Sequence, residues 1–177
     1  GMKKQRSLDT ELMDMIDNLY LLGRRMRMME NKPRRYGGDT PLFPNEVYTL
    51  KAIAQQAGIN QTELSEQMFR TKGATSVVIR KLKKKGLIIQ RDDEQDSRIS
   101  RLYPTEKGME IYRGHLAYDH KYIVELAGSL DVALEDLANM NRVLRSMNQR
   151  FLRRYQEQGT AAFDEADAVL TGDTETE

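Results

Sequence analysis

The 177-residue chain contains no cysteine. This absence excludes disulfide bonds, thiolate metal ligands, cysteine nucleophiles and thiol-based redox sensing. No apolar run approaches the roughly 18 residues of a membrane span, and the start of the chain lacks the apolar segment of a signal peptide. Aromatic residues make up only 7%, yet apolar residues reach 39%, which is enough for a buried core. These features favour a cytoplasmic protein of one domain, or one domain with extensions.

Motifs for catalysis and metal binding are also missing. The chain has no glycine-rich phosphate loop, no Gly-x-Ser-x-Gly motif and no His-Glu-x-x-His pair. His115 and His120 lie five residues apart, so on one helix their side chains point about 140° away from each other. We expect both at ordinary surface or interface positions rather than at a metal site. The sequence therefore predicts neither an enzyme nor a bound cofactor.

The net charge of +1 conceals a concentration of positive charge in the middle of the chain. Residues 70–101 contain ten bases and four acids, a local charge of +6, whereas the remainder has 18 bases and 23 acids, or −5. Residues 157–177 carry seven acids and no base. Such a composition is typical of a solvated segment, so residues 158–177 are predicted to form an acidic, disordered tail.

The spacing of apolar residues predicts long helices on both sides of the basic segment. Apolar residues recur every three or four positions from Leu8 to Glu30, which indicates a first helix. Prolines and glycines in residues 31–44 predict a loop. A fifth helix is expected from Thr105 to about Ala127, and a sixth from near Asp131. The sixth carries a stripe of apolar residues that is typical of a coiled coil and needs a partner: Leu137, Met140, Leu144, Met147 and Phe151.

The middle of the chain predicts shorter elements. Asn45 is expected to cap a second helix, and Asn60 with Glu63 fits a capping box for a third. Thr71 can cap a fourth helix, which should end at Gly86.

Two β-prone runs follow the fourth helix. Residues 87–91 and 98–103 flank the polar residues 92–97, and Pro104 is expected to end the second run. Two short helices joined by a tight turn and followed by a hairpin define a winged helix-turn-helix. The predicted fold class is therefore mainly α with a small β-hairpin wing.

The second helix of this motif enters the DNA major groove, so its side facing away from the core should carry donors and positive charge. The start of this helix, at Thr71 and Lys72, offers backbone N–H groups and the helix dipole to a phosphate. An isolated basic run is more often a solvated surface, but its position between these elements favours DNA binding. The predicted DNA-facing residues of the helix are Thr71, Lys72, Gly73, Ser76, Val77, Arg80 and Lys84.

The predicted wing contains an acid and a base two residues apart. The Asp96 carboxylate can orient the Arg98 guanidinium, which would then enter a narrow minor groove of negative potential. The competing interpretation is an exposed ion pair worth at most about 1 kcal/mol. These two residues alone leave both interpretations open.

Five successive motifs together resemble MarR-family transcriptional regulators. Their order and spacing match from about Asn45 to Gly108. The motifs are Gln61–Glu66, Thr71–Ser76, Lys81–Ile88, Asp96–Arg98 and Thr105–Gly108. The resemblance implies a transcriptional repressor that binds a pseudo-palindromic operator as a homodimer. It also implies DNA contacts by the recognition-helix residues and by Asp96 and Arg98 in the wing.

The resemblance further implies a domain organisation. It divides the chain into residues 2–44 and 105–157 for dimerisation, residues 45–104 for DNA binding, and the tail at 158–177. The first, fifth and sixth helices would interlock in the dimer through apolar residues that include Leu12, Met15, Leu19, Leu137, Met140, Leu144, Met147 and Phe151.

Many members of this family release DNA when a small, often aromatic molecule binds, although no sequence motif identifies the ligand residues here. The alternative function is a winged-helix scaffold that binds proteins and lacks specific DNA binding. Basic charge on both the helix and the wing favours the regulator.

Overall fold

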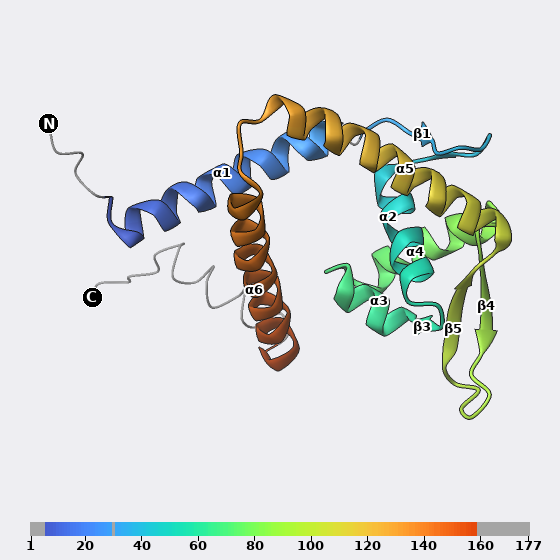
Figure 1. The fold of residues 1–177 in the computed structure, drawn as a ribbon. Coiled ribbons are helices and arrows are strands. Elements are labelled where there is room, and N and C mark those ends of the chain that lie inside the picture. The colour runs from blue at the N-terminus through green and yellow to red at the C-terminus, as the bar shows by residue number, and fades with distance from the viewer. Residues whose placement is uncertain (1–5, 30, 159–177) are drawn as a thin grey trace, which may run out of the picture.

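The computed structural model describes residues 6–29 and 31–158. Figure 1 shows a lobe of short helices and a hairpin on one side, with the long helices α1 and α6 on the other and α5 joining the two. The elements in chain order are α1 Leu8–Met29, β1 Arg34–Arg35, β2 Pro41–Leu42, α2 Pro44–Gln55, β3 Ile59–Asn60, α3 Gln61–Gln67, α4 Lys72–Lys84, β4 Ile88–Asp92, β5 Ser100–Pro104, α5 Glu106–Ser129 and α6 Leu134–Gln158.

The hydrophobic core lies within the lobe. Leu50 of α2, Leu64 of α3, Leu82 of α4 and Leu102 of β5 are all fully buried. Burial of such side chains contributes about 1.5–3 kcal/mol each, so this core fixes how the short helices pack against the hairpin. The predicted fold class, mainly α with a hairpin wing and a helical region beside it, is confirmed.

Three predicted helix caps are present. Asn60 and Glu63 form a reciprocal capping box, in which each side chain accepts a hydrogen bond from the other residue's backbone N–H, at 2.9 and 3.1 Å. Thr71 caps α4 through the Ala74 N–H, and Thr105 caps α5. These bonds satisfy donors that the first turn of a helix leaves unpaired.

The prediction that Asn45 caps the second helix is wrong. Phe43, two residues before Asn45, is the N-cap, and the helix begins at Pro44. Proline is well suited to the first helical position because it lacks the N–H that would be unpaired there. The Glu46 carboxylate accepts a hydrogen bond from the Phe43 N–H at 3.1 Å and performs the capping role.

The strands differ from the prediction at four points. The expected loop at residues 31–44 contains the antiparallel pair β1 and β2. The sequence did not predict β3, which makes the sheet three-stranded in the order β3-β5-β4. Pro104 belongs to β5 and pairs with Ile88, since proline is tolerated at the end of a strand. The second wing strand begins at Ser100, because residues 93–99 form a longer connection than expected.

The long helices lie largely outside the core. None of the residues of α1 or α6 is fully buried, and Leu12, Met140 and Phe151 are 44–54% exposed. α5 continues to Ser129, so α6 begins at Leu134 rather than near Asp131. No helix in residues 6–29 and 31–158 has the length and apolar character needed to cross a membrane. The predicted tail, apart from Gln158, lies outside the described residues.

Candidate nucleic-acid interface

The α3–α4 pair forms the helix-turn-helix. The turn places Phe69 in the left-handed region at φ 52°, and the Arg70 N–H donates to the Ser65 carbonyl at 2.9 Å. The Ser65 hydroxyl donates to Thr75 Oγ1 at 2.9 Å, and Gln61 Nε2 donates to the Lys72 carbonyl at 3.0 Å. These hydrogen bonds, one buried and one exposed, therefore hold α4 at a fixed angle to α3.

One side of α4 is buried and the other faces solvent. The buried residues are those at Thr75, Val78, Ile79 and Leu82. The predicted DNA-facing residues lie on the other side, where Ser76 is half-buried and Thr71, Lys72, Gly73, Val77, Arg80 and Lys84 are exposed. No atom lies within 4 Å of the position that a Cβ on Gly73 would take. The structure thus leaves open space at the glycine where the sequence predicts close approach of DNA.

The end of α4 directs the chain into the wing. Gly86 has a φ of 71°, its N–H donates to the Lys83 carbonyl, and the Leu87 N–H donates to the Leu82 carbonyl at 3.0 Å. This is a Schellman motif, which requires the left-handed conformation that glycine adopts readily. The predicted helix end at Gly86 is confirmed, and strand β4 follows two residues later.

Three of the ten bases in the basic segment, Arg70, Lys85 and Arg101, bond to residues outside that segment. Arg70 donates to Thr49 Oγ1 at 2.7 Å, and burial lowers the pKa of its guanidinium. Lys85 forms an ion pair with the buried Glu46 carboxylate at 2.8 Å. Arg70 and Lys85 hold α2 against the helix-turn-helix, and Arg101 holds the wing. The charges of these three bases are therefore not available to a ligand.

The other bases remain exposed. In the part of the chain that the structure describes, only Arg98 of this group forms an ion pair with an acid. Lys83 donates to the Gln90 side chain at 3.0 Å, and the Arg91 guanidinium lies over the Tyr103 ring. The exposed bases without an acidic partner are Lys72, Arg80, Lys81, Lys83, Lys84 and Arg91. We call this set the basic face.

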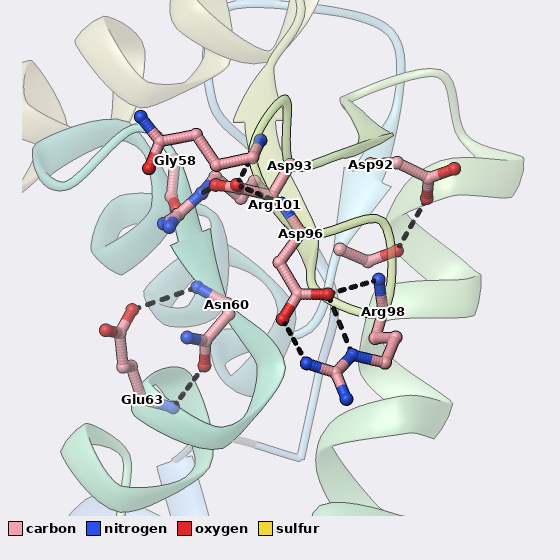
Figure 2. Close-up of polar contacts among 10 residues, drawn as sticks. Gly58, Asn60, Glu63, Asp92, Asp93, Asp96, Arg98 and Arg101 are labelled. Atoms are coloured by element: carbon pink, nitrogen blue, oxygen red, sulfur yellow. Dashed lines mark hydrogen bonds and ion pairs between the residues drawn. The ribbon is translucent and has the colours of Figure 1, made fainter.

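The wing tip holds an arginine in a defined orientation, as Figure 2 shows. Arg98 donates through Nε and Nη2 to the two oxygens of Asp96, both at 2.9 Å, while its backbone N–H donates to Asp96 Oδ1 at 3.1 Å. These bonds lower the pKa of Asp96, chiefly through the guanidinium. The arginine side chain remains 89% exposed. The predicted orientation of Arg98 by Asp96 is confirmed, and the guanidinium can still reach a ligand.

A second acid–base pair, which the sequence did not predict, anchors the wing. Asp93 accepts hydrogen bonds from Arg101 Nε and from the backbone N–H groups of Gln95 and Asp96, and its pKa falls to about 2, mainly because of Arg101. Arg101 also donates to the Gly58 carbonyl at 2.9 Å (Figure 2). The wing tip is therefore tied to the segment that leads into α3.

The expectation of a surface or interface position is wrong for His115. This residue is 2% exposed, and the rings of Tyr36 and Tyr48 meet it edge-on at 5.1 and 5.2 Å. Neither ring nitrogen has a hydrogen-bond partner among the described residues, although Asp119 Oδ2 lies 3.3 Å from Nε2. Burial lowers the pKa of His115. His120, in contrast, is exposed.

His115 lines an open cavity of about 160 Å³. The cavity lies where α1, α2 and α5 come together beside β1. Its walls are formed by Met26, Met29, Arg34, Tyr36, Pro44, Tyr48, His115, Tyr118 and Asp119. No periodicity in the sequence brings these residues together, because they come from four separate segments.

The arrangement of α3, α4 and the hairpin defines a winged-helix domain. Residues 41–99, which include α3, α4 and β4, match the sequence model of the MarR family. An uncharacterised HTH-type transcriptional regulator of Bacillus subtilis, YybA, is 34% identical over 74 residues, which cover 42% of this chain and 49% of the relative. The match therefore spans about half the length of that relative.

Solved structures share the fold over a larger part of the chain. The transcriptional regulator SlyA has a TM-score of 0.67 at 17% identity, covering 81% of this chain and 97% of its own. FabT of Streptococcus pneumoniae, solved in complex with DNA, has a TM-score of 0.54 at 24% identity, covering 80% and 94%. The predicted resemblance to MarR-family transcriptional regulators is confirmed.

Proposed function

We propose that this protein is a sequence-specific DNA-binding transcriptional regulator, and specifically a repressor that binds a pseudo-palindromic operator as a homodimer in the cytoplasm. The observation that carries this proposal is the basic face together with the oriented arginine of the wing. A protein partner would not require both elements to be basic. The DNA complex of the structural neighbour FabT adds support through the shared fold.

The recognition helix divides its contacts by chemistry. Lys72 and the N–H groups near Thr71 bind a phosphate at the start of α4, and Lys84 binds one near its end. Arg80 donates to guanine in the major groove, Ser76 bonds to a base edge, and the exposed Val77 contacts a thymine methyl. Phosphate contacts set the position of α4, and base contacts select the sequence.

The wing reads the neighbouring minor groove. Arg98 inserts its guanidinium where a narrow groove has enhanced negative potential, and Asp96 restricts the orientation in which it enters. The Asp93–Arg101–Gly58 chain of hydrogen bonds keeps the wing at a fixed place relative to α3. Both grooves are therefore read by parts that are held in place before DNA binds.

Dimerisation would place two such lobes on consecutive half-sites. The stripe on α6 and the apolar positions of α1 lie exposed or half-buried in the single chain, as expected for surfaces that a second copy covers. A two-fold dimer matches the symmetry of a pseudo-palindromic operator.

A small aromatic molecule would release the DNA by binding in the cavity beside His115. Three tyrosine rings and the cation of Arg34 suit an aromatic ligand that carries an acidic group. The cavity joins α1 and α5 of the dimerisation region to α2 of the lobe, so a ligand there can change the angle between them.

The test is fluorescence anisotropy on a duplex obtained by in-vitro selection, at fixed salt. Arg80→Ala, Lys72→Ala and Arg98→Ala should each weaken binding by about tenfold, whereas Arg113→Ala, an exposed arginine on α5, should leave it unchanged. Unchanged affinity in all three interface variants would reject the assignment and favour a winged helix that binds proteins.

A further inference from the structure

The end of α6 lies beside the helix-turn-helix. The Tyr155 ring is 5.1 Å from the Phe69 ring in the α3–α4 turn, and Gln156 Nε2 donates to Glu66 Oε2 of α3 at 3.4 Å. Phe69 is only three residues before Lys72, the first residue of α4. The chain therefore leaves α6 at Gln158 close to the start of the recognition helix.

The segment that follows α6 is opposite in charge to the basic face. Residues 159–177 contain six acids and no base. The acids are Asp164, Glu165, Asp167, Asp173, Glu175 and Glu177. The basic face contains Lys72, Arg80, Lys81, Lys83, Lys84 and Arg91, none of which pairs with an acid of the described chain. Opposite charges of this size attract strongly at low salt, and salt screens the attraction.

The segment is also long enough to cover this face. Nineteen residues reach up to about 60 Å when extended, since each spans at most about 3.3–3.6 Å. The 13 residues of α4 extend over about 20 Å, at about 1.5 Å per residue. Attachment of the segment to the same molecule gives it a high effective concentration at the face.

We propose that residues 159–177 bind the basic face when DNA is absent and compete with DNA for it. This inference rests on the proposed function, because the face that the segment covers is the one assigned to DNA. Like DNA, the segment presents a row of negative charges. DNA must displace the segment, which lowers the affinity for non-specific DNA at low salt.

The arginines of α6 itself are the competing place for the acids. Arg150, Arg153 and Arg154 lie within the last nine residues of the helix. However, residues 159–163 carry no charge and separate the first acid, Asp164, from the helix. This uncharged spacer favours binding beyond α6, at α4.

The first test measures where the segment lies. The chain has no cysteine, so Leu170→Cys in the full chain provides a single site for a nitroxide spin label. We expect the label to broaden the amide NMR signals of residues 72–84 at low salt, and a random-sequence DNA duplex or added sodium chloride to restore them. Unbroadened α4 signals, or broadening confined to α6, would overturn the proposal.

The second test measures the competition itself. Neutralising three acids of the segment in the full chain, with Asp164→Asn, Glu165→Gln and Asp167→Asn, should tighten binding to the random duplex by about threefold to tenfold at low salt. The control neutralises three exposed acids elsewhere, with Glu110→Gln, Glu125→Gln and Asp136→Asn, and makes the same change in net charge. Equal effects of the two sets would overturn the proposal.

The two tests separate this proposal from the proposed function. If the protein binds no DNA, the spin label still shows whether the segment lies on α4. If DNA binds but α4 is not broadened, only the proposal about the segment fails.

Discussion

Neighbouring residues at the end of α4 have different roles because their side chains have different partners. Lys85 is bonded to the Glu46 carboxylate, whose side chain is only 2% exposed, whereas Lys84 faces solvent. Removing the Lys85 amine leaves a buried carboxylate without its cation, which is strongly unfavourable. From the sequence alone, these two adjacent lysines would be expected to have the same role.

We therefore predict that two adjacent substitutions affect different properties, one the stability of the fold and the other the binding of DNA. Lys85→Ala should lower the free energy of unfolding by about 1–3 kcal/mol, measured by urea denaturation. Lys84→Ala should change it by less than about 0.5 kcal/mol and weaken binding of the selected duplex instead. A stable Lys85→Ala protein would contradict the role given to the Glu46 pair.

Two glycines provide a second matched pair. A Cβ at Gly108 would lie 2.0 Å from the Leu87 carbonyl oxygen, whereas one at Gly73 would meet nothing within 4 Å. Gly108→Ala should lower the free energy of unfolding by about 3 kcal/mol, because backbone must move. Gly73→Ala should keep or raise stability by up to about 1 kcal/mol and weaken DNA binding, since the added methyl meets the duplex. Unchanged DNA affinity of Gly73→Ala would contradict close approach there.

The pair that anchors the wing predicts a pH dependence of stability. The folded pKa of Asp93 is about 2, below the value of about 3.9 in an unfolded chain. The Asp93–Arg101 interaction therefore stabilises the fold fully above pH about 4 and is lost as the pH falls through about 2. The difference in unfolding free energy between the native chain and Asp93→Asn should shrink over this range in urea titrations. A difference that stays constant would contradict the assignment.

At the scale of elements, the sequence predicts what depends on near neighbours. The caps at Asn60 and Thr71, the helix end at Gly86 and the Asp96–Arg98 pair all rest on residues within five positions of each other. Helix periodicity also identified the exposed side of α4 correctly. Local chemistry decides each of these features, so no tertiary contact is needed to predict them.

Features that depend on distant residues were not predictable. Strands β1, β2 and β3 have two residues each, too few for a periodic signal, and exist because a partner strand lies beside them. The bonds of Arg70, Lys85 and Arg101 join residues 21, 39 and 43 positions apart. From the sequence alone, these three bases appeared available to bind DNA, whereas the fold uses them for internal bonds. The only sequence signal of the Asp93–Arg101 pair was the presence of acids within the basic segment.

At the scale of the whole molecule, the exposed and half-buried apolar stripe of α6 predicts assembly. Leu144→Glu should place a charge in the dimer contact, so the mass in light scattering should fall from twice the 20.5 kDa chain mass to that of one chain. Arg145→Glu, a neighbouring exposed position outside the stripe, is the control and should remain dimeric. A native chain that is monomeric at micromolar concentration would contradict the proposed dimer.

Sequence-specific DNA binding is the central claim, and in-vitro selection from random duplex DNA tests it most directly. The selected sequence and a scrambled one are then compared by anisotropy across a salt series, because phosphate contacts alone give salt-dependent affinity without specificity. The account predicts a pseudo-palindrome that is bound at least about 1000-fold more tightly than the scrambled duplex at physiological salt. Failure to enrich any sequence, or equal affinity for the selected and scrambled duplexes, would contradict it.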